Sequence, residues 1–339
     1  MEVTEHRRIA ITDASCVGEA RRYAVEVART LGMSESGMGR VGVIVTELAT
    51  NVMKHGGGGE ILTRAIPEQE QRGIVVVAID QGLGISNLAA AVRDGHSTAG
   101  SPGTGLGAVK RLADRFDVHS VPGSGTAVLA AIRGEERSSS MLQSARFHVG
   151  AVNVPHPEED VSGDTWAATH SPSVSRILVA DGLGHGVLAA AASREAANIF
   201  RQYPGAGSGE TVERIHAGLR GTRGAAIAVA TVDRGHGSVR YAGIGNIAAT
   251  ICDAEQARSL VSHHGTAGHE ARRVQEFTYP WGVRSMLVMH SDGLTSHWDV
   301  SRQPGFTERD PDLAAAVLYR DFRRGRDDTT VVVARTEAA

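Results

Sequence analysis

Apolar and polar positions repeat with two different periods along the first third of the chain. In residues 18–31 and 40–54, apolar residues recur at spacings of three and four with no internal proline, which predicts two amphipathic helices. Residues 60–66 ("EILTRAI") and 73–80 ("GIVVVAID") are short runs rich in β-branched side chains, which predict strands. We therefore expect a mixed α/β fold in this part of the chain.

A glycine-rich loop and a polar run complete this first half. Residues 94–116 ("DGHSTAGSPGTGLGAVKRLADRF") form a long loop that leads into a helix at about Leu106. After the strand-like "GTAVLAAIRG", the run "EERSSSM" is polar and has no periodicity, which is typical of a linker. Because 339 residues favour two domains, we predict domains at residues 1–134 and 143–339 and a linker at 135–142.

Apolar runs in the second half repeatedly lead into aspartates. The strand-like "RILVADGLGHG" ends at Asp181 and is followed by glycines and a helix. Asp292 follows the run "MLVMHSDGL", and Asp327 and Asp328 precede "TTVVVAR", while Asp164 lies in "VSGDTW". Several β-strands could therefore bring these carboxylates to one end of a sheet sandwich.

Composition and charge exclude some classes of function. With 41% hydrophobic residues and a net charge of −3, the chain is typical of a globular protein without a basic face for nucleic acid. Its two cysteines, Cys16 and Cys252, lie too far apart for CxxC chemistry and fit a reducing compartment. No apolar run reaches the ~18 residues of a membrane span, and the N-terminus lacks a signal peptide's apolar segment. We expect a cytoplasmic protein with no membrane partner.

Candidate chemistry in the first half begins on the second predicted helix. Glu47 and Asn51 are four residues apart and therefore share one face, where they could hold a metal ion with its waters or simply form a solvated face. Asp80 ends a predicted strand, and its carboxylate can accept a hydrogen bond from an exocyclic amine. Gly82 and Gly84 would let the backbone approach a flat ring beside it.

The glycine loop is a candidate site for phosphate groups. Its backbone amides and the following helix N-terminus could cradle phosphates, with Lys110 and Arg111 close by or merely on the helix surface. The Walker pattern GxxxxGK[ST] is absent. The Rossmann pattern requires its glycines after an early strand, whereas this loop follows two helices and two strands.

The ordered set ELxxN, DxGxG, GTGLG and "GSGTAV" resembles the GHKL (Bergerat) ATP-binding α/β sandwich of histidine kinases, gyrase and anti-sigma-factor serine kinases, and within it the RsbT-like switch kinases. The resemblance covers residues 1–133 and implies ATP and Mg as cofactors. It implies Asn51 as the magnesium ligand, Glu47 as the base toward the substrate hydroxyl and Asp80 as the adenine reader. The remaining implied nucleotide-site residues are Gly82, Gly84, Gly103, Gly105, Leu106, Gly107, Lys110 and Thr126.

The clustered aspartates of the second half suggest hard divalent cations. Neighbouring carboxylates repel one another and have raised pKa values unless a cation neutralises them. Oxygen-only ligands suit Mg or Mn, and two such ions could activate a water for attack on phosphorus. The alternative is that each aspartate only ends a strand, as turn aspartates often do.

The order GD, DGxGxG, SDG and DDxT resembles the PPM-type serine/threonine phosphatases, in the SpoIIE branch and close to RsbX-like enzymes. The resemblance spans about residues 143–335 and implies an αββα sandwich with two Mn or Mg ions. It implies that Asp164 and Asp181 bridge the metals and that Gly182 offers its carbonyl. Asp292 and Asp327 would complete one metal's shell, with Asp328 as the alternative to Asp327.

Together the two resemblances imply a bifunctional switch in bacterial sigma-factor or stress signalling. The N-terminal half would phosphorylate a serine or threonine on a STAS-domain partner, and the C-terminal half would remove the same kind of mark. Two other interpretations stay open. The first is an anti-sigma factor that binds a sigma factor directly, and the second is a chain with one active half whose other half senses nucleotide or docks substrate.

Overall fold

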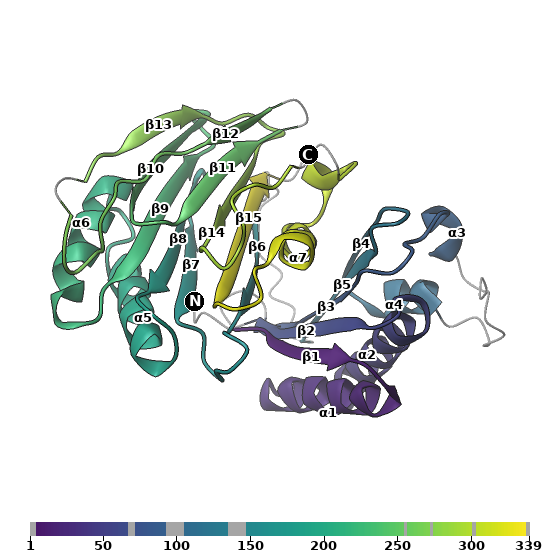
Figure 1. The fold of residues 1–339 in the computed structure, drawn as a ribbon. Coiled ribbons are helices and arrows are strands. Elements are labelled where there is room, and N and C mark those ends of the chain that lie inside the picture. The colour runs from purple at the N-terminus through teal and green to yellow at the C-terminus, as the bar shows by residue number, and fades with distance from the viewer. Residues whose placement is uncertain are drawn as a thin grey trace. The chain divides into compact units, whose positions relative to one another are not determined.

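The fold is described from a computed structural model, which divides the chain into two compact units (Figure 1). The structure describes residues 5–66, 72–92, 105–134, 147–253, 256–271, 274–299 and 303–336. The N-terminal unit comprises His6–Met141 and Arg302–Arg320, and the C-terminal unit comprises Met1–Glu5, Leu142–Ser301 and Asp321–Ala339.

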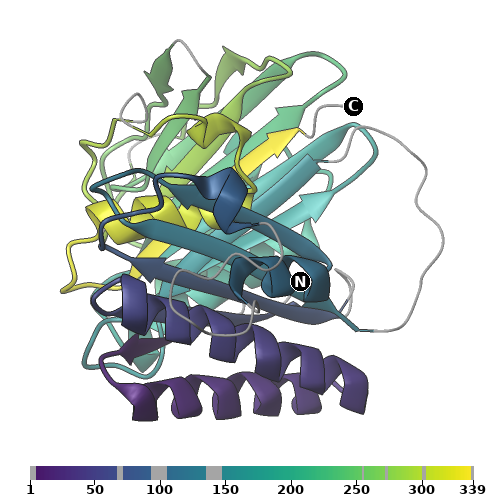
Figure 2. The same cartoon turned by 90° about the vertical axis from the view of Figure 1, so that its right-hand side faces the viewer.

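The N-terminal unit contains one five-stranded sheet in the strand order β1-β2-β3-β5-β4, with helices α1 and α2 packed on one face. All neighbouring strands in it are antiparallel. Helices α1 and α2 lie side by side against the sheet in both views (Figures 1 and 2). Its elements are β1 (Arg7–Ile11), α1 (Ala14–Thr30), α2 (Glu35–His55), β2 (Gly59–Ile66), β3 (Gly73–Asp80), α3 (Leu88–Ala91), α4 (Gly105–Leu112), β4 (Arg115–Ser120) and β5 (Thr126–Arg133).

Both helices predicted from the apolar spacing are present, and each begins earlier than predicted. The side chain of Asp13 accepts a hydrogen bond from the Ser15 amide, so α1 begins at Ala14. The Ser34 hydroxyl accepts from the Gly37 amide and caps α2 in the same way. The apolar stripe marked only the buried turns, because capping residues are polar and fall outside it.

Residues Arg302–Arg320 belong to the N-terminal unit, although they follow strand β14 of the C-terminal unit in sequence. They hold the short helix η4 (Phe306–Glu308) and most of α7 (Pro311–Phe322). Ten consecutive residues of α7, Pro311–Arg320, are buried. The sequence pattern had placed no boundary there.

The C-terminal unit is built on two five-stranded sheets. Their strand orders are β13-β10-β9-β8-β7 and β12-β11-β14-β15-β6, and all pairings are antiparallel. Helices α5 and α6 pack on the first sheet. The elements are β6 (Phe147–Val154), β7 (Asp164–His170), β8 (Val174–Gly182), α5 (Val187–Gln202), α6 (Ser208–Gly218), β9 (Ala225–Asp233), β10 (Ser238–Ile244), β11 (Ala248–Cys252), β12 (Ala257–Ser259), β13 (Phe277–Pro280), β14 (Met286–His290) and β15 (Thr329–Thr336).

Two apolar layers stabilise this unit. Trp166, Tyr241 and Met289 are among the buried side chains of the layer between the sheets. Phe200 and Ile215 belong to the layer between the first sheet and the two helices. Alternate strand residues point to opposite faces, so the first sheet buries apolar side chains on both sides. In the part of the chain that the structure describes, no helix has the length and apolar character needed to cross a membrane.

Candidate active sites

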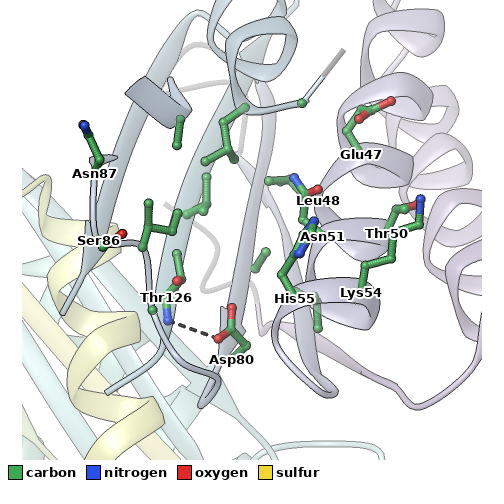
Figure 3. A pocket seen from close by; sticks show the side chains of 18 of the residues that line it. Glu47, Leu48, Thr50, Asn51, Lys54, His55, Asp80, Ser86, Asn87 and Thr126 are labelled. Atoms are coloured by element: carbon green, nitrogen blue, oxygen red, sulfur yellow. Dashed lines mark hydrogen bonds between the residues drawn. The ribbon is translucent and has the colours of Figure 1, made fainter. Parts of the chain in front are cut away.

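A pocket of about 610 Å³ opens between helix α2 and the loops that follow β3 in the N-terminal unit (Figure 3). This volume suits a cofactor-sized ligand. Several predicted nucleotide-site residues line it, namely Glu47, Asn51, Asp80, Gly84, Gly105, Leu106 and Thr126. Sequence reasoning had not singled out other lining residues, including Lys54, His55, Ser86 and Asn87.

Helix α2 presents Glu47 and Asn51 to this pocket because the two residues are one helical turn apart. Another stripe of the helix, which includes Val41, Val45 and Ala49, is buried in the core. This packing fixes the rotation of α2 about its axis and keeps the polar pair on the pocket side. Their predicted roles as base and magnesium ligand stay predictions.

Asp80 is held in place by two backbone amides at the end of β3. Its Oδ1 accepts hydrogen bonds from the amide of Gly82 at 2.9 Å and from that of Thr126 at 3.2 Å, the second of which Figure 3 shows. Among the described residues, Oδ2 accepts no hydrogen bond, which leaves it available to a ligand amine. Burial raises the pKa of Asp80, while the two amides oppose that shift.

The glycines after Asp80 have specific steric reasons. Gly84 has a φ of +69°, and a Cβ at this position would lie 2.4 Å from the carbonyl oxygen of Val121. A Cβ on Gly82 would lie 2.8 Å from the His55 carbonyl oxygen and 2.9 Å from the Gly56 Cα. The turn therefore packs so closely against neighbouring backbone that a side chain at either position would clash.

The remaining predicted nucleotide-site residues lie on or before α4. Gly107 is buried within this helix, while Lys110 is exposed and is not among the residues that line the pocket. Gly103 lies outside the described residues. The predicted phosphate contact of Lys110 therefore stays a prediction.

We expect Asp80→Asn in the full chain to weaken ADP binding by ten-fold or more, because an amide that accepts two backbone hydrogen bonds through its oxygen would turn its NH₂ toward the ligand amine. Calorimetry with Mg·ADP measures the change. Glu47→Ala is the matched control in the same pocket and should leave ADP affinity within about two-fold, because Glu47 is assigned to the substrate hydroxyl. Equal ADP affinities for Asp80→Asn and the unchanged chain would contradict the assignment.

The C-terminal unit brings the predicted aspartates together at one end of its sheets. Asp164 begins β7 and lies directly opposite Asp181 near the end of β8. Like charges at such a cross-strand pair are destabilising unless a cation intervenes. A Cβ on Gly182 would lie 2.1 Å from the Ala189 carbonyl oxygen, so only glycine fits beside Asp181.

The other three carboxylates come from the turns at the ends of β14 and β15. Asp292 accepts a hydrogen bond from the Asn246 side chain at 2.8 Å. Asp327 accepts from the Asp328 amide at 3.0 Å, and Asp328 accepts from the His156 amide at 2.8 Å. These hydrogen bonds from neighbouring protein groups fix the orientation of the three carboxylates.

Burial and mutual repulsion raise the pKa values of four of these aspartates. Burial is the largest cause for Asp164, whose pKa rises to about 7, and for Asp181, whose pKa lies well above its usual range. The pKa values of Asp292 and Asp328 are also raised, chiefly by burial and further by Asp327. Such a cluster favours either protons or cations.

Unpaired oxygens show where a cation fits. Asp164 Oδ1 and Asp328 Oδ2 are buried and have no hydrogen-bond partner among the described residues. The described side chains do not form a preformed cage, since no three His, Cys, Asp or Glu groups stand together at metal-binding distance. A cation would therefore draw these carboxylates closer. An all-oxygen donor set with two orphaned buried oxygens fits Mg or Mn.

We expect Mn²⁺ to raise the melting temperature of the chain more at about pH 8 than at about pH 6. An unfolded aspartate titrates near pH 4 and Asp164 near 7, so the metal-free fold loses stability as pH rises through this window. The cation binds the deprotonated carboxylates and must displace protons at the lower pH. Calorimetry with and without Mn²⁺ measures the gain, and equal gains at both pH values would contradict the assignment.

Sequence reasoning missed residues that orient the aspartates. The Ser291 hydroxyl donates to Asp164 Oδ2 at 2.6 Å, and the adjoining SDG motif was the available signal for it. His156 had no signal in the sequence. His185 bonds to Glu159 at 2.7 Å through Nδ1 and stacks on His156 with ring centroids 4.8 Å apart.

The two sites and folds define two enzyme classes in one chain. The N-terminal α/β sandwich with its pocket beside α2 is a GHKL-type ATPase fold, and the C-terminal double sheet with its aspartate cluster is a PPM-type phosphatase fold. The protein-family model of the histidine kinase-like ATPase domain matches residues 12–132. The family model of stage II sporulation protein E (SpoIIE) matches residues 171–337.

The serine/threonine-protein kinase RsbT of Bacillus subtilis is 35% identical to this chain over 128 residues, which are 35% of this chain and 96% of RsbT. The chain therefore belongs, through its N-terminal part, to the RsbT family of serine/threonine kinases. It carries a SpoIIE domain, of a serine/threonine phosphatase family, in its C-terminal part. Both resemblances inferred from the motifs are confirmed.

Solved structures agree with this assignment. The SpoIIE phosphatase domain of Bacillus subtilis with a fragment of its regulatory domain has a TM-score of 0.50 at 18% identity, covering 96% of this chain and 98% of that one. RsbX in complex with magnesium has a TM-score of 0.51 at 16% identity, and the match covers 58% of this chain and 98% of RsbX. At these identities the likeness is one of fold. A chain from a study of the bacterial stressosome has a TM-score of 0.53 at 26% identity, and the match covers 56% of this chain and 100% of that one.

Proposed function

We propose that this chain both adds and removes phosphate on a serine or threonine of a STAS-domain protein, as a switch in bacterial stress or sigma-factor signalling. The observation that carries the proposal is that one chain holds a nucleotide-sized pocket with Asp80 presented to it and a separate cluster of five aspartates. RsbT is named as a serine/threonine kinase, and a stressosome structure is similar to part of this chain. These likenesses support the partner class.

In the kinase step, Asp80 would accept a hydrogen bond from the adenine amine through its open Oδ2. Asn51 would hold Mg, which supplies positive charge to the phosphates when bound. Glu47 would take the proton from the substrate hydroxyl as its oxygen bonds to the γ-phosphorus and the bond to the bridging β–γ oxygen breaks. ADP leaves with the electron pair of that bond.

In the phosphatase step, Asp164, Asp181, Asp292, and Asp327 or Asp328 would hold two Mg or Mn ions together with the Gly182 carbonyl. These ions supply a water of lowered pKa when bound. Ser291 and Asn246 keep Asp164 and Asp292 oriented through the hydrogen bonds described above. The water oxygen would bond to phosphorus as the bond from phosphorus to the serine or threonine oxygen breaks. That oxygen would take a proton, so that the free hydroxyl and inorganic phosphate are the products.

The proposal is tested by recovering STAS-domain proteins on the full chain from lysate and mapping their phosphosites. The purified partner should gain phosphate from ATP in the presence of the chain and lose it when ATP is removed and Mn²⁺ is present. Transfer to no STAS protein, in a chain that binds ATP, would contradict the partner class. A stable complex with a sigma factor that nucleotide modulates would favour the anti-sigma alternative instead.

A further inference from the structure

The face of the N-terminal sheet that lies opposite its helices carries a charged row. On β4, Arg115, Asp117 and His119 occupy alternate positions and therefore share one face. Arg115 pairs across the sheet with Ala131, Ala131 with Val75, and Val75 with Arg64. The two arginines thus lie on one cross-strand row, separated by two strands.

This face is apolar between the charges. Leu62, Val75, Val77 and Leu129 are fully buried, yet they do not belong to the core that the sheet shares with α1 and α2. An apolar face of this size requires a cover within the fold. Residues 303–320, which come from the sequence region matched to SpoIIE, bond to it.

The segment docks through charges of complementary sign. Asp312 of α7 accepts from both Arg64, at 2.9 Å, and Arg115. The Arg64 and Asp312 side chains are 4% and 2% exposed, so this ion pair is deeply buried. Arg115 also lies 3.3 Å from Asp310. Breaking a buried pair leaves an uncompensated charge, so the pair specifies where α7 sits.

Contacts on either side of this pair hold the rest of the segment. Arg309 lies 3.0 Å from Asp117, whose other oxygen accepts from the Asp310 amide at 2.8 Å. His119 and Gln303 share a hydrogen bond of 2.8 Å between buried side chains. The segment is thus bonded to β4 along three alternate residues.

The far end of the segment is bonded to the residue that follows Asp80. Gln81, the residue after Asp80, donates from its side chain to the Arg320 carbonyl at 3.3 Å. The Arg320 charge also acts on the Asp80 carboxylate. The end of α7 is therefore bonded one residue along the chain from Asp80, which lines the pocket.

The same helix continues by covalent connection into the aspartate cluster of the C-terminal unit. Thr295 donates its amide to the Phe322 carbonyl at 3.0 Å, and Arg324 donates its amide to the Gly293 carbonyl at 2.8 Å. Gly293 adjoins Asp292, and Asp327 follows Arg324 by three residues. The last turn of α7 and the next six residues therefore run from Gln81 to two predicted metal ligands.

We propose that residues 303–320 are a docking element of the kinase sheet and that, through α7, nucleotide bound beside Asp80 sets the rate of the phosphatase site. The inference rests on the proposed function of both sites. Coupling between two sites of one protein commonly changes a binding or rate constant five-fold or more. The chemical class of the effector is an adenine nucleotide.

The test uses the full chain with p-nitrophenyl phosphate, a small substrate that needs no docking of a protein partner. Free Mn²⁺ is buffered to one level with and without saturating ADP, because ADP binds metal. We expect ADP to change the hydrolysis rate by about five-fold. Asp80→Asn should need at least ten times more ADP for the same change, which excludes an effect of ADP on the metal or the substrate.

A double variant, Arg309→Ala with Gln81→Ala, removes two of the partly exposed docking contacts and spares the buried Arg64 pair. It should keep the rate without ADP and lose most of the ADP response, with ADP affinity checked by calorimetry. Arg214→Ala is the matched control, because Arg214 forms an exposed ion pair with Glu210 on α6. It should keep the full response.

The outcomes separate this inference from the proposed function. A chain that binds ADP and hydrolyses the substrate at a rate that ADP leaves unchanged overturns the coupling alone. A full ADP response in the double variant also overturns the role of the segment. A chain that fails to bind ADP or fails to hydrolyse phosphate esters contradicts the proposed function, and the inference with it.

Discussion

Asp181→Asn in the full chain should lower Mn²⁺-dependent hydrolysis of a phosphoserine peptide by about 100-fold or more. Even residues that only orient metal ligands typically contribute 10- to 100-fold, and Asp181 is assigned as a ligand itself. Its strand register places it against Asp164, so its loss removes one side of the predicted bridge. Initial rates of phosphate release at saturating Mn²⁺ measure the loss.

A matched control for this change is Asp233→Asn. Asp233 also ends a strand of the same sheet, but its carboxylate bonds to His236 at an exposed turn. It should keep the rate within about two-fold, as is usual for surface substitutions. Unchanged activity of Asp181→Asn, or full activity of the unchanged chain in EDTA, would refute the metal site. Strong activity on phosphotyrosine alone would refute the substrate class.

Two variants of the full chain should drive a STAS partner to opposite states of phosphorylation. With ATP, the unchanged chain should hold the partner at an intermediate level, because one reaction consumes ATP and the other releases phosphate. The phosphorylation level of the partner is therefore set by the ratio of the kinase rate to the phosphatase rate. It is not an equilibrium between the two forms. Asp181→Asn should bring the partner close to full phosphorylation, and Glu47→Ala should leave it nearly bare, since a general base contributes about 10²- to 10⁴-fold.

Intact-mass spectrometry of the partner over time measures its phosphorylated fraction directly. The double variant Glu47→Ala with Asp181→Asn is the control and should leave the partner in whichever state it is supplied. If the unchanged chain and Asp181→Asn phosphorylate the partner equally, while the unchanged chain hydrolyses a generic phosphopeptide, the two sites serve different proteins. That result would favour the sigma-binding alternative.

The sequence predicted both folds and most of the pocket because the signals were local. Glu47 and Asn51 are read from helical spacing, and Asp80 from its place at a strand end followed by glycines. The pocket in the structure is lined by these residues. A motif of a few neighbouring residues specifies its own local backbone conformation. It can therefore be recognised without knowledge of the rest of the chain.

The docking of residues 303–320 could not be predicted, because its contacts join distant parts of the chain. Arg64 and Asp312 are 248 residues apart in sequence, and each lies in a stretch that reads as an ordinary strand or helix. Asn246 illustrates the same limit on a smaller scale. Its bond to Asp292 depends on the meeting of two sheet ends, which no local pattern around Asn246 shows.

The placement of α7 also bears on how such a gene can evolve. A split of the gene within residues 135–141 would put Arg64 and Arg115 in one product and Asp312 in another. The first product would then lose the cover of this sheet face, so that Leu62, Val77 and Leu129 would be exposed to water and the two arginines would lose their carboxylate partner. Domain shuffling would meet the same obstacle, so the kinase and phosphatase halves of this lineage should be inherited and exchanged only as a pair.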